Sequence, residues 1–105
     1  MMELPFEEEA AHELEAAATW YESEREGYGE VFLDEVEAKV GRAARFPGSG
    51  PRIVLPGLPL EHDVRRFPLE RFQYQVITAI VAGRRAVVAI AHTSRRPGYW
   101  LNRLP

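Results

Sequence analysis

The chain contains no cysteine and no long apolar segment. Without cysteine there is no disulfide scaffold, no thiolate metal site and no cysteine nucleophile. No apolar run approaches the roughly 18–20 residues that cross a bilayer. The first nine residues are acidic and lack the basic and apolar regions of a secretory signal. We therefore expect a single cytoplasmic domain over residues 1–105, with no membrane partner.

The sequence also lacks the short motifs of common catalytic sites. Its histidines, His12, His62 and His92, have none of the spacings of a zinc site, and no serine lies in a nucleophile elbow. The glycines between residues 48 and 57 alternate with prolines and precede no helix, unlike those of a phosphate-binding loop. We therefore predict neither a metal site nor a cofactor.

Charge is divided unevenly along the chain. Residues 1–41 hold thirteen acidic and two basic side chains, whereas residues 42–105 hold three acidic side chains and eleven arginines. The acidic part is typical of solvated helices. The arginine-rich part offers forked donors for phosphates or carboxylates, so candidate binding residues are expected there.

Apolar residues predict two helices that together form a hairpin. They recur at helical spacing over residues 7–24 and again over residues 30–46. The segment around Tyr28, with a glycine on each side, breaks the first pattern, and Pro47 ends the second. The two apolar stripes have to pack against each other and against a third surface, which indicates a helical hairpin.

The remaining residues predict a small antiparallel sheet. Residues 47–61 contain four prolines and three glycines and are expected to form a loop. Strands are predicted at residues 2–6, 62–69, 72–81 and 84–92, with a tail over residues 93–105. The unbroken apolar run of residues 86–91 predicts a strand covered on both faces, in an interior position of the sheet. The fold class is therefore α+β, in the order β-α-α-β-β-β, with the helical hairpin packed on the sheet.

Adjacent arginines stand in the segment VRRF, residues 64–67. Because side chains alternate along a strand, Arg65 and Arg66 are predicted to point to opposite faces. One of them is expected to pair with a helix carboxylate, and the other is a candidate for binding a partner.

A second candidate segment, AHTSRRPGYW, follows the apolar run and occupies residues 91–100. Guanidinium groups bind phosphate, aromatic rings stack on bases and imidazole transfers protons, so this mixture suits nucleic acid. Trp100 is expected to anchor the tail to the core. For His92, Arg95 and Arg96, anchoring the tail and binding a target both remain open.

Three stretches, in this order and spacing, carry a family resemblance. They are AHELEAAATWYE (11–22), GEVFLDEV (29–36), and VRRFPLERFQY (64–74) joined to VVAIAHTSRRPGYW (87–100). Over nearly the whole chain they resemble the RelE/ParE superfamily of type II toxin–antitoxin toxins, in particular its ParE-like plasmid-stabilisation branch. The resemblance implies a helical hairpin on an antiparallel sheet and a cognate antitoxin that blocks the toxin in a hetero-oligomer.

Departures from the family pattern bear on mechanism. RelE-like members cut mRNA on the ribosome without metal, whereas ParE-like members are associated with poisoning DNA gyrase. RelE-like nucleases carry an arginine directly after the strand tyrosine, which corresponds to Tyr74 here, but this chain has Gln75 at that place. Their second arginine would fall near Ser94, and their C-terminal tyrosine would fall near Trp100. Loss of these groups removes transition-state stabilisation, which favours a ParE-like toxin or a degenerate toxin over an mRNA endonuclease.

Three hypotheses follow from the resemblance. The first is a toxin that binds a macromolecular target, namely gyrase, through Arg65, Arg66, Arg95, Arg96 and Tyr99. The second is a metal-independent, ribosome-dependent mRNA endonuclease, in which Arg65, Arg66 and Arg96 stabilise the phosphorane-like charge and His92 or Tyr99 handles protons. The third is a degenerate toxin retained as an interaction partner.

The antitoxin is expected to bind a groove in the arginine-rich part. Such a groove would be floored by Ile53 and Val54 and rimmed by arginines, with Arg84 and Arg85 among them. This combination should attract an amphipathic segment that carries acidic side chains.

Overall fold

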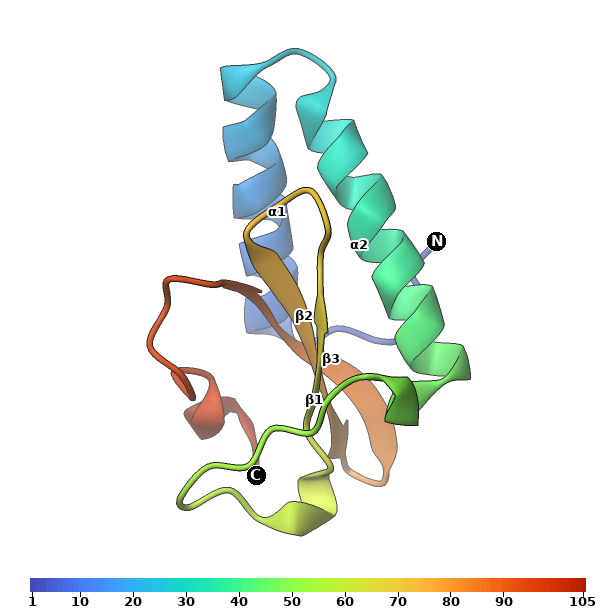
Figure 1. Ribbon diagram of the computed structural model, residues 1–105, viewed down its shortest axis with the longest axis vertical. Helices are drawn as coiled ribbons and strands as arrows, with labels where there is room; N and C mark the ends of the chain where they lie inside the picture. Colours follow the sequence, from blue (N-terminus) through green and yellow to red (C-terminus); the bar gives the residue numbers. More distant parts are fainter.

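A helical hairpin packs on a three-stranded antiparallel sheet in the computed structural model, which describes residues 1–105 (Figure 1). The helices are α1 (Glu8–Glu24) and α2 (Tyr28–Arg45). The strands are β1 (Arg65–Pro68), β2 (Tyr74–Val81) and β3 (Arg84–His92), adjacent in that order. This arrangement confirms the predicted α+β class. Neither helix is long and apolar enough to span a bilayer.

The hairpin closes tightly between α1 and α2. Gly27 has the left-handed φ of 84°, which favours glycine, and α2 begins directly after it. The carboxylate of Glu22 accepts hydrogen bonds from the backbone N–H groups of Gly27 (2.9 Å) and Gly29 (3.0 Å). A Cβ at Gly29 would lie 2.6 Å from the carbonyl oxygen of Ala18, so the helices can approach this closely only because residue 29 is glycine. The predicted break is confirmed, and α2 begins two residues earlier than the spacing predicted.

One face of the sheet is buried against the helices. Phe32, Val36 and Val40 of α2 are completely buried there, because they recur on one side of the helix. The small side chains of Ala10 and Ala17 let α1 lie close to β3. This helix-side core also contains Phe67, Phe72, Val76, Val87 and Ile90.

The opposite face of the sheet is covered by the loop after α2 and by the C-terminal tail. Leu58 from the loop and Trp100 from the tail bury against Ile77 and Ala91, and Trp100 is only 3% exposed. This second core confirms that β3 is covered on both faces. The pairing shifts by one residue between Ile77 and Thr78, which places Val88 and Ala89 of β3 in the same core.

Strand boundaries differ from those predicted at three places. Residues 2–6 contribute only a parallel bridge between Phe6 and Val87, so β3 lies at the edge of the three-stranded sheet rather than inside it. β1 begins at Arg65 because Leu60–His62 form a 3-10 turn that ends at Asp63. β2 begins at Tyr74, two residues after the predicted start.

Candidate docking surface

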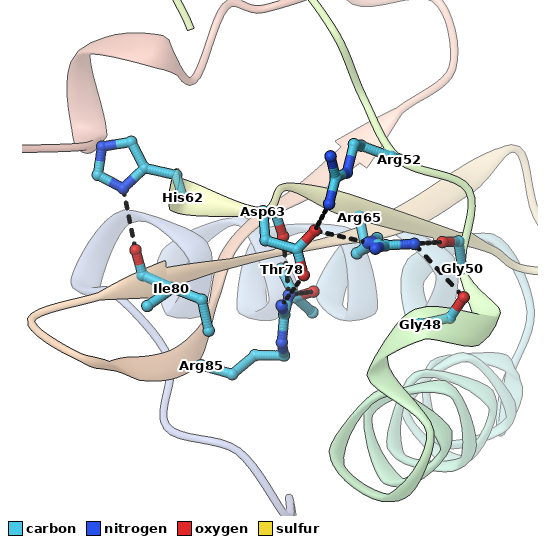
Figure 2. A network of polar contacts seen from close by, with 9 residues as sticks. All are labelled: Gly48, Gly50, Arg52, His62, Asp63, Arg65, Thr78, Ile80 and Arg85. Carbon is cyan, nitrogen blue, oxygen red and sulfur yellow. Dashed lines mark hydrogen bonds and ion pairs between the residues drawn. The ribbon is translucent and has the colours of Figure 1, made fainter. Parts of the chain in front are cut away.

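Two of the predicted binding arginines are turned inward onto Asp63 (Figure 2). The Nε of Arg65 lies 3.0 Å from Asp63 Oδ1, and the Nη2 of Arg85 lies 2.6 Å from Asp63 Oδ2. Arg52 donates to the same carboxylate at 3.0 Å. One carboxylate therefore holds three guanidinium groups, a set that we name the Asp63 network.

The backbone at Asp63 aims its carboxylate into this network. Asp63 has φ 43° and ψ 60°, the left-handed conformation that aspartate tolerates better than most residues. Arg85 also donates to the hydroxyl of Thr78 (2.9 Å), and Arg65 to the carbonyl of Gly50 (3.1 Å). The network therefore ties the loop after α2 to β1 and β3.

The tail is tied to α1 by a second polar cluster around Glu13. Its carboxylate accepts hydrogen bonds from the hydroxyl of Tyr99 (2.7 Å) and from two nitrogens of Arg103 (2.8 and 2.9 Å). Burial and the hydrogen bond to Glu13 raise the pKa of Tyr99 well above its usual value. The phenol of Tyr99, a predicted target contact, is thus occupied inside the molecule, while the buried Trp100 anchors the tail as expected.

Both acidic centres make stability depend on pH. Burial alone would raise the pKa of Asp63 and of Glu13, but their arginine partners outweigh it, so both pKa values lie below the usual ones. A carboxylate with a lowered pKa in the folded state stabilises that state above its unfolded pKa, and this contribution is lost as the pH falls through the folded pKa.

We expect the free energy of unfolding to fall as the pH drops below about 4.5, the usual pKa of glutamate at Glu13. The variant Glu13→Gln should show a shallower fall, measured by urea unfolding between pH 7 and pH 3. Glu15→Gln, an exposed neighbour on α1, is the control and should follow the unaltered chain. A Glu13→Gln profile with the slope of the control would contradict the assigned role of Glu13.

The loop after α2 and the tail lie at the end of the molecule opposite the turn between α1 and α2 (Figure 1). Residues of both segments line a cationic groove. Its volume is about 470 Å³. Arg66 of β1, Gln75 of β2 and Arg95 of the tail line it, together with Arg52, residues 53–55, Thr93, Pro97, Gly98 and Trp100. No carboxylate lines the groove, and neither Arg66 nor Arg95 forms an ion pair.

The groove brings together residues from two of the predicted sets. Arg66 and Arg95 were predicted to bind a target, and Ile53 and Val54 to bind an antitoxin; all four line this one concavity. Val54 is 67% exposed, which leaves an apolar side chain beside the two arginines. The groove therefore offers both charge and apolar contact to a partner.

The remaining predicted residues lie elsewhere. Arg96 is exposed beside Arg95 but does not line the groove, and Arg84 is exposed at the far end of the β2–β3 pair. His92 packs edge-on against Tyr74 at 5.0 Å between ring centroids, next to α1. No group of three or more histidine or acidic side chains is placed to hold a metal ion.

Alternation along β1 does separate the adjacent arginines, as predicted. Arg65 joins the Asp63 network and Arg66 lines the groove. The pairing acid, however, is Asp63 and not a helix carboxylate. The signal for it was the scarcity of acids after residue 41, because Asp63 is one of only three there. Sequence reasoning also missed Gln75 and Arg52 as groove residues.

Comparisons with known proteins bear on the fold. No family model matches the chain, and no curated protein matches it. A solved chain described as "Chromosomal ParDE TA system from P. aeruginosa" matches with a TM-score of 0.62 and 21% sequence identity. The match covers 88% of this chain and 96% of that chain. The chain therefore shares the α+β fold of that chain, a helical hairpin on a three-stranded antiparallel sheet, which is the RelE/ParE-like fold that the sequence resemblance implied.

Proposed function

We propose that the chain is a ParE-like toxin that acts in the cytoplasm by binding DNA gyrase and is neutralised by a cognate antitoxin. The observation that carries the proposal is the cationic groove on this fold, which is lined by arginines and by no carboxylate. An enclosed or internally neutralised arginine cluster would leave no surface for another macromolecule.

The chemistry of the groove suits an acidic partner segment. Arg66 and Arg95 have no internal counter-ion, so a carboxylate or phosphate from a partner gains charge-assisted hydrogen bonds without breaking existing ones. Ile53 and Val54 add apolar area next to these charges. An antitoxin segment that fills the groove would exclude the target from the same residues, which gives neutralisation a direct physical cause.

The residues of the nuclease alternative do not converge. Tyr99 donates its hydroxyl hydrogen to Glu13, and its raised pKa disfavours proton transfer at neutral pH. His92 lies against Tyr74 near α1, whereas Arg66 lines the groove on the other side of the sheet. At the position after Tyr74, where RelE-like nucleases carry an arginine, the groove is lined by the neutral Gln75. This geometry supports binding over RNA cleavage.

Induced expression in a bacterial host without antitoxin separates the three hypotheses. We expect growth arrest with gyrase-linked DNA breaks, reversed when the product of the neighbouring reading frame is expressed with the chain. Total mRNA from the same culture should show no new cuts. Cuts at ribosome-positioned sites would contradict the proposal in favour of a nuclease, and normal growth at an equal protein level would indicate a degenerate toxin.

A further inference from the structure

A second concavity lies between the hairpin and the end of the sheet where Tyr74 pairs with His92. It consists of two adjoining pockets of about 480 and 290 Å³, which share Trp20, Tyr74 and His92. We name it the aromatic trough, because its walls include Trp20, Tyr21, Tyr28, Phe72, Tyr74 and His92. Apart from Arg95, which also lines the cationic groove, the proposed toxin function makes no use of these residues.

The rings of the trough form a continuous wall. Tyr21 lies 5.1 Å from Trp20 and 4.8 Å from Phe72 between ring centroids, both in edge-to-face geometry. Tyr28 lies 5.1 Å from Phe72 on the side of α2. Such mutual contacts hold the rings in place, yet Trp20 remains 58% exposed. An exposed indole on a rigid aromatic wall is a surface on which another flat ring can stack.

Arginines line both pockets of the trough, and the one carboxylate that lines it, Glu13, is already bound. Arg71 lines one pocket and Arg95 the other. The oxygens of Glu13 are taken by Arg103, Tyr99 and the N–H of Ile90. Glu35, which lies outside the trough, accepts from the backbone N–H groups at positions 70 and 71 and lies 3.6 Å from the Nε of Arg71, whose side chain is still 65% exposed. Arg95 lies over the ring of Tyr99 at 3.8 Å but forms no ion pair, so the charge that the trough presents to a ligand is positive.

Polar groups for the edge of a bound ring are also present. Nδ1 of His92 accepts a hydrogen bond from the N–H of Ser94 at 3.0 Å. An imidazole that accepts at Nδ1 carries its proton on Nε2, which is left as a donor. Gln73 lines the same pocket and is exposed, and its amide offers both a donor and an acceptor.

We propose that the aromatic trough binds a nucleobase together with its attached phosphate. The base stacks on Trp20, and Arg71 or Arg95 binds the phosphate. Stacking on exposed aromatic rings and forked binding by arginine are the two interactions that such a ligand combines. The ligand is either a free nucleotide or one nucleotide of a single strand, since both present the same chemistry.

Tryptophan fluorescence tests this site directly. The chain has two tryptophans, and Trp100 is buried, so a ligand that stacks on the surface should quench Trp20. Purified full-length protein is titrated with AMP, with ribose 5-phosphate and with a ten-nucleotide single strand of deoxyadenosine. We expect saturable quenching by AMP, by the single strand or by both, and none by ribose 5-phosphate. Quenching by AMP identifies a free nucleotide as sufficient, and quenching by the single strand alone identifies a strand.

Variants assign the quenching to the trough. Replacing both Arg71 and Arg95 by alanine should weaken binding about tenfold, the effect of one lost charge-assisted hydrogen bond. Arg84→Ala, at the far end of the β2–β3 pair, is the matched control and should bind normally. No quenching by AMP or the single strand, quenching that persists in Trp20→Phe, or unchanged affinity in the double variant would overturn the proposal. These outcomes are read from fluorescence and not from toxicity, and Arg71 and Trp20 lie outside the cationic groove, so a failure here is distinguishable from a failure of the proposed function even though Arg95 lines both sites.

Discussion

Replacing Asp63 by alanine is expected to lower the free energy of unfolding by about 3 kcal/mol. The substitution leaves Arg65 and Arg85 without their counter-charge, although their side chains are only 18% and 10% exposed. Buried guanidinium groups cannot recover full hydration, so the cost exceeds that of breaking a surface ion pair. The value lies at the low end for a buried pair because Asp63 itself is 26% exposed. A domain of this size is only about 5–15 kcal/mol stable, so the loss is large but leaves it folded.

Urea unfolding followed by circular dichroism measures this loss. Asp63→Asn keeps a hydrogen-bond acceptor and a side chain that tolerates the left-handed backbone, so it should lose roughly half as much. Glu61→Ala removes an exposed acid that forms no ion pair and should change little. If Asp63→Ala were as stable as Glu61→Ala, the Asp63 network would not hold the loop to the sheet.

Reversing the charge of both groove arginines, Arg66→Glu with Arg95→Glu, is expected to abolish toxicity while the fold is kept. Both side chains are exposed and form no ion pair, so the fold loses only the contact between the Arg95 guanidinium and the Tyr99 ring at 3.8 Å. An acidic partner would then meet like charges, which costs several kcal/mol. Since each 1.4 kcal/mol is tenfold, affinity should fall by at least about a hundredfold. Growth after induction in the same bacterial host measures the effect.

The matched control for this pair is Arg84→Glu. Arg84 is also exposed and unpaired, but it lies outside the groove. Cells that express this variant should arrest like those with the unaltered chain. Arrest by the double variant, at an equal level of folded protein, would show that the groove is not the working surface.

Regular elements were predictable where the pattern is local. The apolar stripes of α1 and α2 follow the helical period, and each helix then buries its stripe on the same sheet. β3 agrees with the prediction at both ends because its apolar run needs cover on two faces. Residues 2–6 form only a bridge at Phe6. The pattern of apolar and polar residues does not reveal how many backbone hydrogen bonds a segment makes to its neighbouring strand.

The use of each arginine was less predictable than its position. The alternation of side chains along β1 predicted that Arg65 and Arg66 point to opposite faces. Which of the two arginines gains a counter-ion depends on the left-handed backbone at Asp63, a tertiary feature that residue spacing does not encode. Arg85 was expected at the antitoxin groove, but it lies in the Asp63 network, and the spacing of residues does not encode this pairing either. The groove itself is formed by two segments, the loop and the tail, that contact each other only in the folded chain.

The most direct measurement is the affinity of the purified chain for purified DNA gyrase at low and high salt. We predict that the unaltered chain and Arg84→Glu bind, that binding weakens as salt screens the groove charges, and that Arg66→Glu with Arg95→Glu does not bind. Absence of binding by the unaltered chain at low salt, or equal binding by the double variant, would contradict the assignment of the cationic groove as the surface that captures the target.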